Sequence, residues 1–196
     1  MTLVTSRRLT GFAAALFLAG ALHAQKLPRV RIETSLGAIE AEIDTVHAPM
    51  TGRNFLAYVA KHFYDHGLFH RTVTLANQPD KLVKIEVIQA AGDTTRADDG
   101  FQPIPLERTS VTGLRHKAGT LSMARGGPDT AQDQFFICVT DQPELDFGGK
   151  RNPDGQGFAA FGRVISGQNV VKAIQRSPAK GQQLTPPITI LRVARR

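Results

Sequence analysis

Hydrophobic and polar residues alternate along much of the chain beyond residue 29, and this alternation is typical of half-buried β-strands. In Val30–Asp44 apolar residues alternate with polar ones on both sides of a turn at residues 35–37, so the sequence predicts a β-hairpin there. Short apolar or alternating runs predict six more strands, over residues 68–73, 83–91, 120–123, 135–140, 158–165 and 188–193. The dipeptide Pro186-Pro187 is expected to end a linker in front of the last strand.

Two other segments have the spacing of amphipathic helices. The first begins at Pro49 and is expected to end at residues 65–67, and the second covers Asn169–Gln175. Their apolar faces are formed by Phe55, Leu56, Val59 and Phe63 in the first and by Val170, Val171 and Ile174 in the second. Because strands and helices do not alternate regularly, the 196 residues are predicted to form one mainly β domain, either a closed barrel or a sandwich.

The N-terminus has a different pattern. Arg7-Arg8 precede an apolar run, Leu9–Leu22, that is too short for a membrane-spanning helix, which needs about twenty residues. A basic start, a short apolar run and small residues after it are typical of a secretory signal peptide. A buried N-terminal helix is the less favoured alternative, because no later segment continues its periodicity.

The predicted domain boundaries follow from this signal. Residues 1–24 are assigned to the signal peptide and residues 25–196 to the mature domain, with cleavage after Ala21 or Ala24 left open. The protein is therefore expected to be exported, to a periplasm or to the medium, and to have no stable membrane association once the signal is removed.

Composition excludes several classes of function. The net charge of +7 comes from scattered basic residues, without the basic and aromatic clusters of a nucleic-acid interface, so no nucleic-acid ligand is expected. The single cysteine, Cys138, precludes an intramolecular disulfide and lies in an apolar run where it is expected to be inert.

Three chemical motifs lack the context that they need. His62, His66 and His70 are spaced for a metal site on a continuous helix, but Gly67 interrupts that helix, so no metal is expected. The tripeptide at 146–148 matches a kinase motif without the accompanying kinase motifs. Ser122 lacks the glycine-flanked elbow of a serine hydrolase.

Five blocks in order along the chain resemble those of cyclophilins. They are Phe69-His70-Arg71, Val87-Ile88-Gln89, Leu121 to Arg125, Gln134 to Cys138, and Phe161 to Val164. The resemblance extends from about Val30 to Val193. It implies a closed eight-stranded antiparallel β-barrel capped by two α-helices. It also implies peptidyl-prolyl cis-trans isomerase activity on proline-containing unfolded or extended polypeptides, without a cofactor; we expect the protein to act as a monomer.

The same resemblance implies roles for individual residues. Arg71 is the implied catalytic residue, since a guanidinium can donate a hydrogen bond to the proline nitrogen while the X-Pro bond is twisted. The implied substrate-binding residues are Gln89, Met123, Ala124, Arg125, Gly126, Gln134, Phe136, Leu145 and Phe158.

The sequence departs from the family pattern near the implied site. The interval between Arg71 and Gln89 is longer than usual, Glu86-Val87 replaces a common Phe-Met pair, and an extra residue follows Gln89 and could shift it. Arg125 replaces a frequent asparagine and is expected to add charge beside the peptide-binding edge. These departures leave two hypotheses, an active isomerase that assists the folding of exported proteins and a peptide-binding module or chaperone with weak or no isomerase activity.

Overall fold

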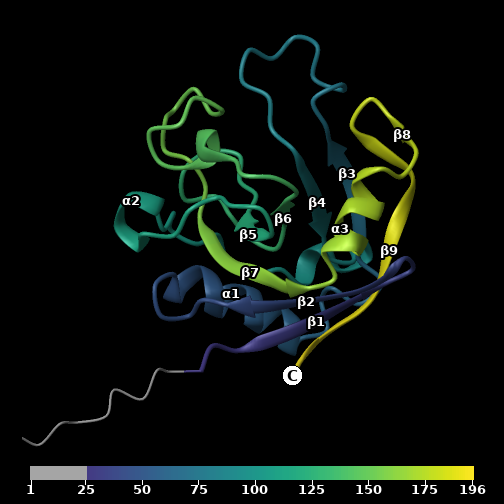
Figure 1. The fold of residues 1–196 in the computed structure, drawn as a ribbon. Helices are drawn as coiled ribbons and strands as arrows, with labels where there is room; N and C mark the ends of the chain where they lie inside the picture. The colour runs from purple at the N-terminus through teal and green to yellow at the C-terminus, as the bar shows by residue number, and fades with distance from the viewer. Residues whose placement is uncertain (1–25) are drawn as a thin grey trace, which may run out of the picture.

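The computed structural model describes residues 26–196, so the predicted signal peptide lies outside the described residues (Figure 1). Three α-helices, α1 (Pro49–Ala60), α2 (Thr109–Thr112) and α3 (Gln168–Gln175), and two 3₁₀ turns, Thr94–Asp99 and Pro143–Leu145, occur among nine strands. The strands are β1 (Arg29–Thr34), β2 (Gly37–Ile43), β3 (Leu68–Val73), β4 (Val87–Ala91), β5 (Thr120–Met123), β6 (Phe135–Cys138), β7 (Ala160–Ser166), β8 (Ala179–Lys180) and β9 (Gln183–Arg195).

The strands form a closed antiparallel barrel. Their order is β1-β2-β7-β5-β6-β4-β3-β9, and β9 pairs with β1 to close the circle. The two-residue β8 pairs only with the start of β9 and lies outside the circle. The predicted eight-stranded barrel is therefore confirmed.

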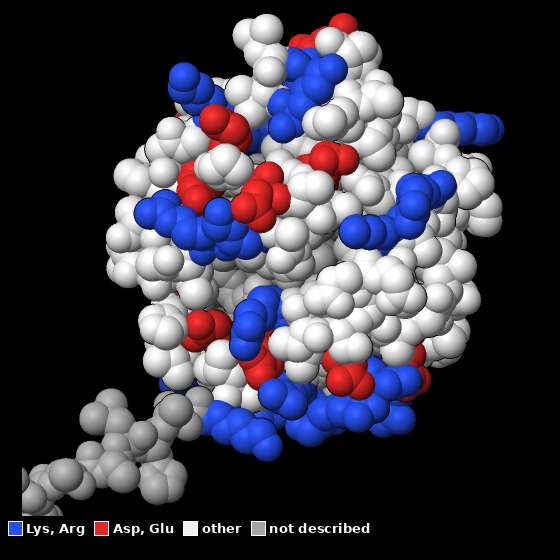
Figure 2. Space-filling model, viewed as in Figure 1, with Lys and Arg blue, Asp and Glu red and all other residues white. Residues whose placement is uncertain are grey.

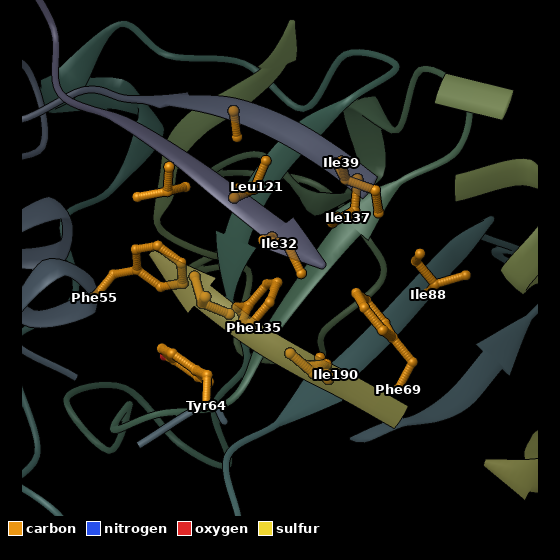
Figure 3. Close-up of a cluster of buried hydrophobic side chains, with 14 of the residues drawn as sticks. Ile32, Ile39, Phe55, Tyr64, Phe69, Ile88, Leu121, Phe135, Ile137 and Ile190 are labelled. Atoms are coloured by element: carbon orange, nitrogen blue, oxygen red, sulfur yellow. The ribbon is translucent and has the colours of Figure 1, made fainter. Parts of the chain in front are cut away.

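The barrel interior is filled by side chains from alternate positions along its strands. Ile32 and Ile39 face each other across β1 and β2, and Phe55, from α1, meets Phe135 of β6 edge to face at a centroid distance of 5.3 Å (Figure 3). All four side chains are inaccessible to solvent. The apolar residues of the alternating pattern thus form the interior face of the barrel.

Helices α1 and α3 cap this barrel with their apolar faces. In α3, Val170, Val171 and Ile174 join the core cluster, as the sequence predicted. No side chain of its own N-cap residue binds the first turn of α1; instead the buried Glu107 accepts hydrogen bonds from the backbone N–H groups of Met50 (3.1 Å) and Thr51 (2.7 Å). A carboxylate at this end of a helix is stabilised by the helix dipole.

Three predicted boundaries were wrong by more than two residues. Helix α1 ends at Ala60 because His62 has a positive φ of 54°, yet Phe63 still packs on Tyr58 (4.8 Å between ring centroids), which explains its apolar spacing. Strand β4 begins at Val87 and not at residue 83. The side chain of Gln78 hydrogen-bonds both the backbone N–H and the carbonyl of Ile85, so these groups are not available to a neighbouring strand.

The third boundary concerns the proline pair. Pro186-Pro187 lies inside β9, where the pairing with β3 shifts between Gln183 and Ile188 and no ladder partner needs the missing N–H groups. Helix α2, with four residues, was not predicted.

Charged side chains of both signs are interspersed over the face drawn in Figure 2. On the wall of the barrel, Glu42 of β2 accepts hydrogen bonds from Arg29 of β1 (2.8 Å) and Arg163 of β7 (2.6 Å). Of the described helices, none is long and apolar enough to cross a membrane.

Candidate active site

A second apolar cluster lies outside the barrel, on the face opposite the core side of β4 and β6. It consists of Val73, Ile85, Val87, Phe136, Cys138 and Leu145, with Ala124 and Phe158 packed against it. Phe136 and Phe158 meet edge to face at 5.3 Å between centroids. This cluster forms the floor of a pocket of about 220 Å³, which is also lined by Arg71, Gln89, Arg125, Arg151 and Asn152.

Arg71 lies at the edge of this pocket and is held by two side-chain amides. Its Nη1 donates to Oε1 of Gln89 (2.8 Å), and its Nε and Nη2 both donate to Oε1 of Gln182 (3.0 and 2.6 Å). Burial and then the nearby charge of Arg151 lower the pKa of Arg71 from its ordinary value. An arginine has so high an intrinsic pKa that it stays charged near neutral pH. The guanidinium is therefore half-buried, fixed in direction and charged.

Strand register explains why Arg71 and Gln89 meet. Arg71 is opposite Gln89 across β3 and β4, and Gln89 is opposite Phe136 across β4 and β6. Side chains directly opposite each other point to the same face of a sheet. Gln89 also donates from Nε2 to Oε1 of Gln134 (2.9 Å), so these residues form one row across the outer face.

The extra residue after Gln89 does not displace it. The irregularity in pairing lies in β3, between Phe69 and Arg71, while β4 pairs continuously with β6 from Val87 to Ala90. The bulge thus leaves His70 of β3 unpaired, and Gln89 keeps its register with Phe136 of β6.

The replacement of the usual Phe-Met pair by Glu86-Val87 does not place the Glu86 carboxylate in the pocket. Glu86 points away from the pocket and accepts hydrogen bonds from Thr140 (3.0 Å) and Gln175 (3.3 Å). Ile85 and Val87, on either side of it, line the pocket instead. Sequence reasoning did not assign a binding role to Ile85 or Val87, although their spacing of two was the available signal.

Most of the implied site residues are brought together. Arg71, Gln89, Ala124, Arg125, Phe136, Leu145 and Phe158 line the apolar pocket. Gln89, Ala124 and Arg125 also line an adjoining pocket of about 290 Å³, with Gly126 and Gln134 among its other walls. Met123 is the exception, since its side chain lies in the barrel core, 1% exposed, and lines neither pocket.

Arg125 does not add free charge to the edge where a peptide was expected to bind. Its Nη1 and Nη2 donate to the carboxylate of Asp154 (2.8 and 3.0 Å), and its Nε and Nη2 donate to the carbonyl of Gly157 (2.8 and 2.6 Å). The guanidinium also lies over the ring of Phe158, 5.0 Å from its centroid. Arg125 is therefore neutralised and braces the loop that carries Phe158.

A buried polar network that was not predicted lies behind Phe136. The ring of His116 stacks on that of Phe136 (6.0 Å between centroids) and contacts Asp146 through Nδ1 (2.7 Å) and Ser122 through Nε2 (2.9 Å). Burial raises the pKa of Asp146, but hydrogen bonds from His116 and the charges of His116 and Arg115 outweigh it and lower the pKa overall. Ser122 is inaccessible to solvent, so the network positions Phe136 and cannot attack a substrate.

Gln182 is a further residue that sequence reasoning missed. It lies between α3 and β9, far from Arg71 in the sequence, and donates from Nε2 to the carbonyl of Asn77 (3.2 Å). Asn77 in turn donates to the carbonyls of Thr72 (3.0 Å) and Gly181 (3.0 Å). No motif marks Gln182, because its role depends on two loops that meet only in the folded chain.

Within residues 26–196, no group of three His, Cys, Asp or Glu side chains is placed to hold a metal ion. His62, one of the three histidines with helical spacing, contacts Asp65 instead (3.1 Å). Burial raises the pKa of Cys138 well above its ordinary value, so its thiol stays protonated.

Comparison with known proteins identifies this arrangement. A family model for the cyclophilin type peptidyl-prolyl cis-trans isomerases matches residues 29–195. The chain belongs to this family. The cyclophilin is 36% identical to a peptidyl-prolyl cis-trans isomerase of Streptomyces antibioticus over 167 residues, which cover 82% of this chain and 94% of the relative. It is 33% identical to isomerase A of Dickeya dadantii over 174 residues, covering 88% and 81% of the two chains.

Solved structures agree on the fold. The crystal structure of a cyclophilin type isomerase from Cryptosporidium parvum matches with a TM-score of 0.69 at 24% identity, over 87% of this chain and 98% of that one. The same Cryptosporidium protein was also solved in the presence of the dipeptide Ala-Pro. The family model and the curated relatives make this cyclophilin a peptidyl-prolyl cis-trans isomerase by family.

Proposed function

We propose that this isomerase accelerates X-Pro bond rotation in exported polypeptides and so assists their folding, with Arg71 as its catalytic residue. The observation that carries the catalytic assignment is the fixed guanidinium of Arg71 at the edge of an apolar pocket.

The chemistry of the X-Pro bond explains why such a guanidinium suffices. Resonance in the C–N bond sets a barrier of about 18–20 kcal/mol, and unaided isomerisation takes tens to hundreds of seconds. In the twisted state conjugation is lost, so the proline nitrogen becomes pyramidal and accepts a hydrogen bond. A donor aimed at this nitrogen stabilises the twisted state more than either planar state, which lowers the barrier.

Two features of the site fit Arg71 to this role. Its partners Gln89 and Gln182 are neutral, so they fix its direction without cancelling its charge. Phe136, Leu145 and Val87 offer apolar walls on which a proline ring can rest while the acyl side rotates.

The rest of the groove accounts for binding of an extended peptide. Ala124, Arg125 and Gly126 follow the end of β5 and line the two adjoining pockets, with Gln89 and Gln134 beside them. We assign the proline ring to the apolar pocket and the neighbouring residues to the more polar one. The role as a monomer without a nucleic-acid partner belongs to the same proposal.

The exported destination rests on the sequence of the first 24 residues, with their basic start and short apolar run. Mapping the mature N-terminus after cell fractionation tests it: a mature chain starting at residue 22 or 25 outside the cytoplasm is expected. An uncleaved chain recovered in the cytoplasm would contradict export while leaving the isomerase assignment intact.

The catalytic assignment is tested by isomerisation of a proline peptide, followed through a protease-coupled assay. We expect Arg71→Ala to lower kcat/KM by about 100-fold, the usual loss when one transition-state donor is removed. The control is Arg53→Ala, which removes an exposed arginine of α1 and is expected to keep full activity. Equal activity of Arg71→Ala and the wild type would overturn the role of Arg71, and an inactive wild type that still binds the peptide would favour the peptide-binding module.

A further inference from the structure

Three arginines line the apolar pocket: Arg71, Arg125, which Asp154 neutralises, and Arg151. Arg151 comes from the loop between β6 and β7 and lines the same pocket, together with its neighbour Asn152. Its Nη1 donates to Oε1 of Gln78 (2.9 Å) and to the carbonyl of Val83 (2.7 Å). Arg151 is therefore held by uncharged acceptors of the long loop between β3 and β4, which projects from the barrel (Figure 1).

Within the described part of the chain, neither Arg71 nor Arg151 has an acidic partner. Among residues 26–196, no carboxylate lies within 4.0 Å of the guanidinium of Arg71 or Arg151, whereas Arg125 is bound by Asp154 at 2.8 Å. The two charges are close enough to repel each other, since Arg151 lowers the pKa of Arg71. The pocket thus combines an apolar floor with an uncompensated positive wall, and an anion placed there would be attracted by both groups.

The groove suggests where on a substrate such an anion would sit. The adjoining polar pocket shares Gln89, Ala124 and Arg125 with the apolar pocket, while Arg151 and Asn152 line only the apolar pocket. A peptide with its proline ring on Phe136 therefore has one neighbour directed toward the polar pocket and the other directed toward Arg151.

Bond rotation decides which neighbour can use Arg151 throughout the reaction. The residue before the proline is attached through the rotating bond. The residue after it is bonded to the proline carbonyl carbon, which is attached to the ring at Cα, so it moves with the ring. A carboxylate on the following residue can keep its ion pair in the cis, trans and twisted states. Such uniform binding lowers KM and leaves kcat unchanged.

We propose that Arg151 is a specificity-determining residue that selects substrates with aspartate or glutamate directly after the proline. This inference rests on the proposed placement of the proline ring beside Arg71. It adds a class of preferred substrate, acidic Pro-Glu and Pro-Asp sequences, to the isomerase activity.

The test compares two blocked peptides, Ala-Ala-Pro-Glu-Ala and Ala-Ala-Pro-Gln-Ala, which differ in one charge. NMR exchange at several peptide concentrations yields kcat and KM, and a binding titration yields Kd independently of catalysis. For the wild type we expect KM and Kd to be about threefold lower for the glutamate peptide, the effect of a half-exposed ion pair, with equal kcat. The ratio of the Kd values of the glutamine and glutamate peptides should approach one in about 0.5 M salt, because salt at that concentration screens charges beyond ~5 Å.

Three variants separate charge from loop structure. Arg151→Gln should bring the ratio of the two Kd values to about one, and Arg151→Lys should keep most of the preference because it keeps the charge. Gln78→Ala loosens the loop that Arg151 holds while leaving Arg151 charged, so it should retain a preference for the glutamate peptide.

Several outcomes would overturn the proposal. One is a wild type that binds the two peptides with equal Kd at low salt. Another is an Arg151→Gln variant that keeps the wild-type ratio of Kd values. A third is a preference only for peptides with glutamate before the proline. Loss of the preference in Gln78→Ala with Arg151 intact would assign it to the loop instead. If the wild type turned over neither peptide but still bound the glutamate peptide more tightly, the isomerase assignment would fail and the selectivity of Arg151 would stand.

Discussion

The interior of the barrel and the groove on its outer face use the same strands but are held together differently. Interior side chains such as Phe135 touch many apolar neighbours, so each position is supported by several others. In the groove, Arg71 depends on two amide side chains, one of them on a distant loop. The packing of the interior is therefore redundant, whereas the groove depends on a few specific contacts.

Phe135 and Phe136 make this comparison between adjacent residues. Phe135 faces the interior and meets the rings of Phe55 and Tyr64 at 5.3 and 5.5 Å. Phe136 faces outward, into the smaller cluster that floors the pocket. Both are nearly inaccessible to solvent, so burial alone does not distinguish a core residue from a site residue.

The largest expected effect comes from removing these two rings. Phe135→Ala should lower the free energy of unfolding by about 3–5 kcal/mol, since it leaves a closed cavity. Phe136→Ala should cost less, about 2–3 kcal/mol, because its cavity opens into a pocket that water can enter. It should also lower kcat/KM about tenfold or more, because the proline ring loses an apolar wall worth ~1–2 kcal/mol.

Urea unfolding and the peptide assay measure both quantities. Activity is compared below the unfolding transition of each variant, so that loss of folded protein is not mistaken for loss of catalysis. A Phe136→Ala protein that is fully active, or less stable than Phe135→Ala, would contradict the separation of interior and groove.

The next effect concerns the network that links the two regions. Asp146→Asn removes the charge that binds the side chain and backbone of His116, at 2.7 and 3.1 Å, and should cost about 1–3 kcal/mol of unfolding free energy. Asp141→Asn is the control, because Asp141 pairs with Lys117 at an exposed site and should matter less.

Asp146 also makes the stability of the protein depend on pH. The pKa of Asp146 is lowered in the folded state, so the unfolded state binds the proton more readily and stability rises with pH. The contribution is complete above the ordinary value of 3.8 and is lost as the pH falls below it toward the folded pKa. Unfolding free energies measured between about pH 5 and pH 3 should therefore fall less steeply for Asp146→Asn than for the wild type. Parallel slopes would show that Asp146 is not stabilised as a carboxylate.

The smallest effect isolates the support of Arg71. Gln182→Ala and Gln182→Met both remove the oxygen that accepts from Nε and Nη2. Both should lower kcat about tenfold, which corresponds to ~1.4 kcal/mol of transition-state stabilisation, with little change in KM or in unfolding free energy. The exposed neighbour in Gln183→Ala serves as the control. A drop in stability that matches the drop in activity would make Gln182 a structural residue only.

Most of the fold and most of the groove residues could be predicted from the sequence, because local patterns along the chain indicate them. Alternation predicted the hairpin and most strands, since a barrel strand buries every second residue. The ordered motif blocks named the family and most of the groove, including Arg71, Gln89 and Phe136. Met123 was predicted to line the pocket on the same evidence, but its side chain lies on the interior side of β5, in the barrel core.

Only the tertiary structure decided how charge is distributed around the groove. Arg125 and Arg151 are the same residue type in the sequence, yet Asp154 neutralises one and uncharged acceptors hold the other. Gln182 becomes a support for Arg71 only where two loops meet. Alternation is a property of neighbouring residues and is readable along the chain, whereas pairing of long polar side chains depends on distances that exist only after the barrel has closed.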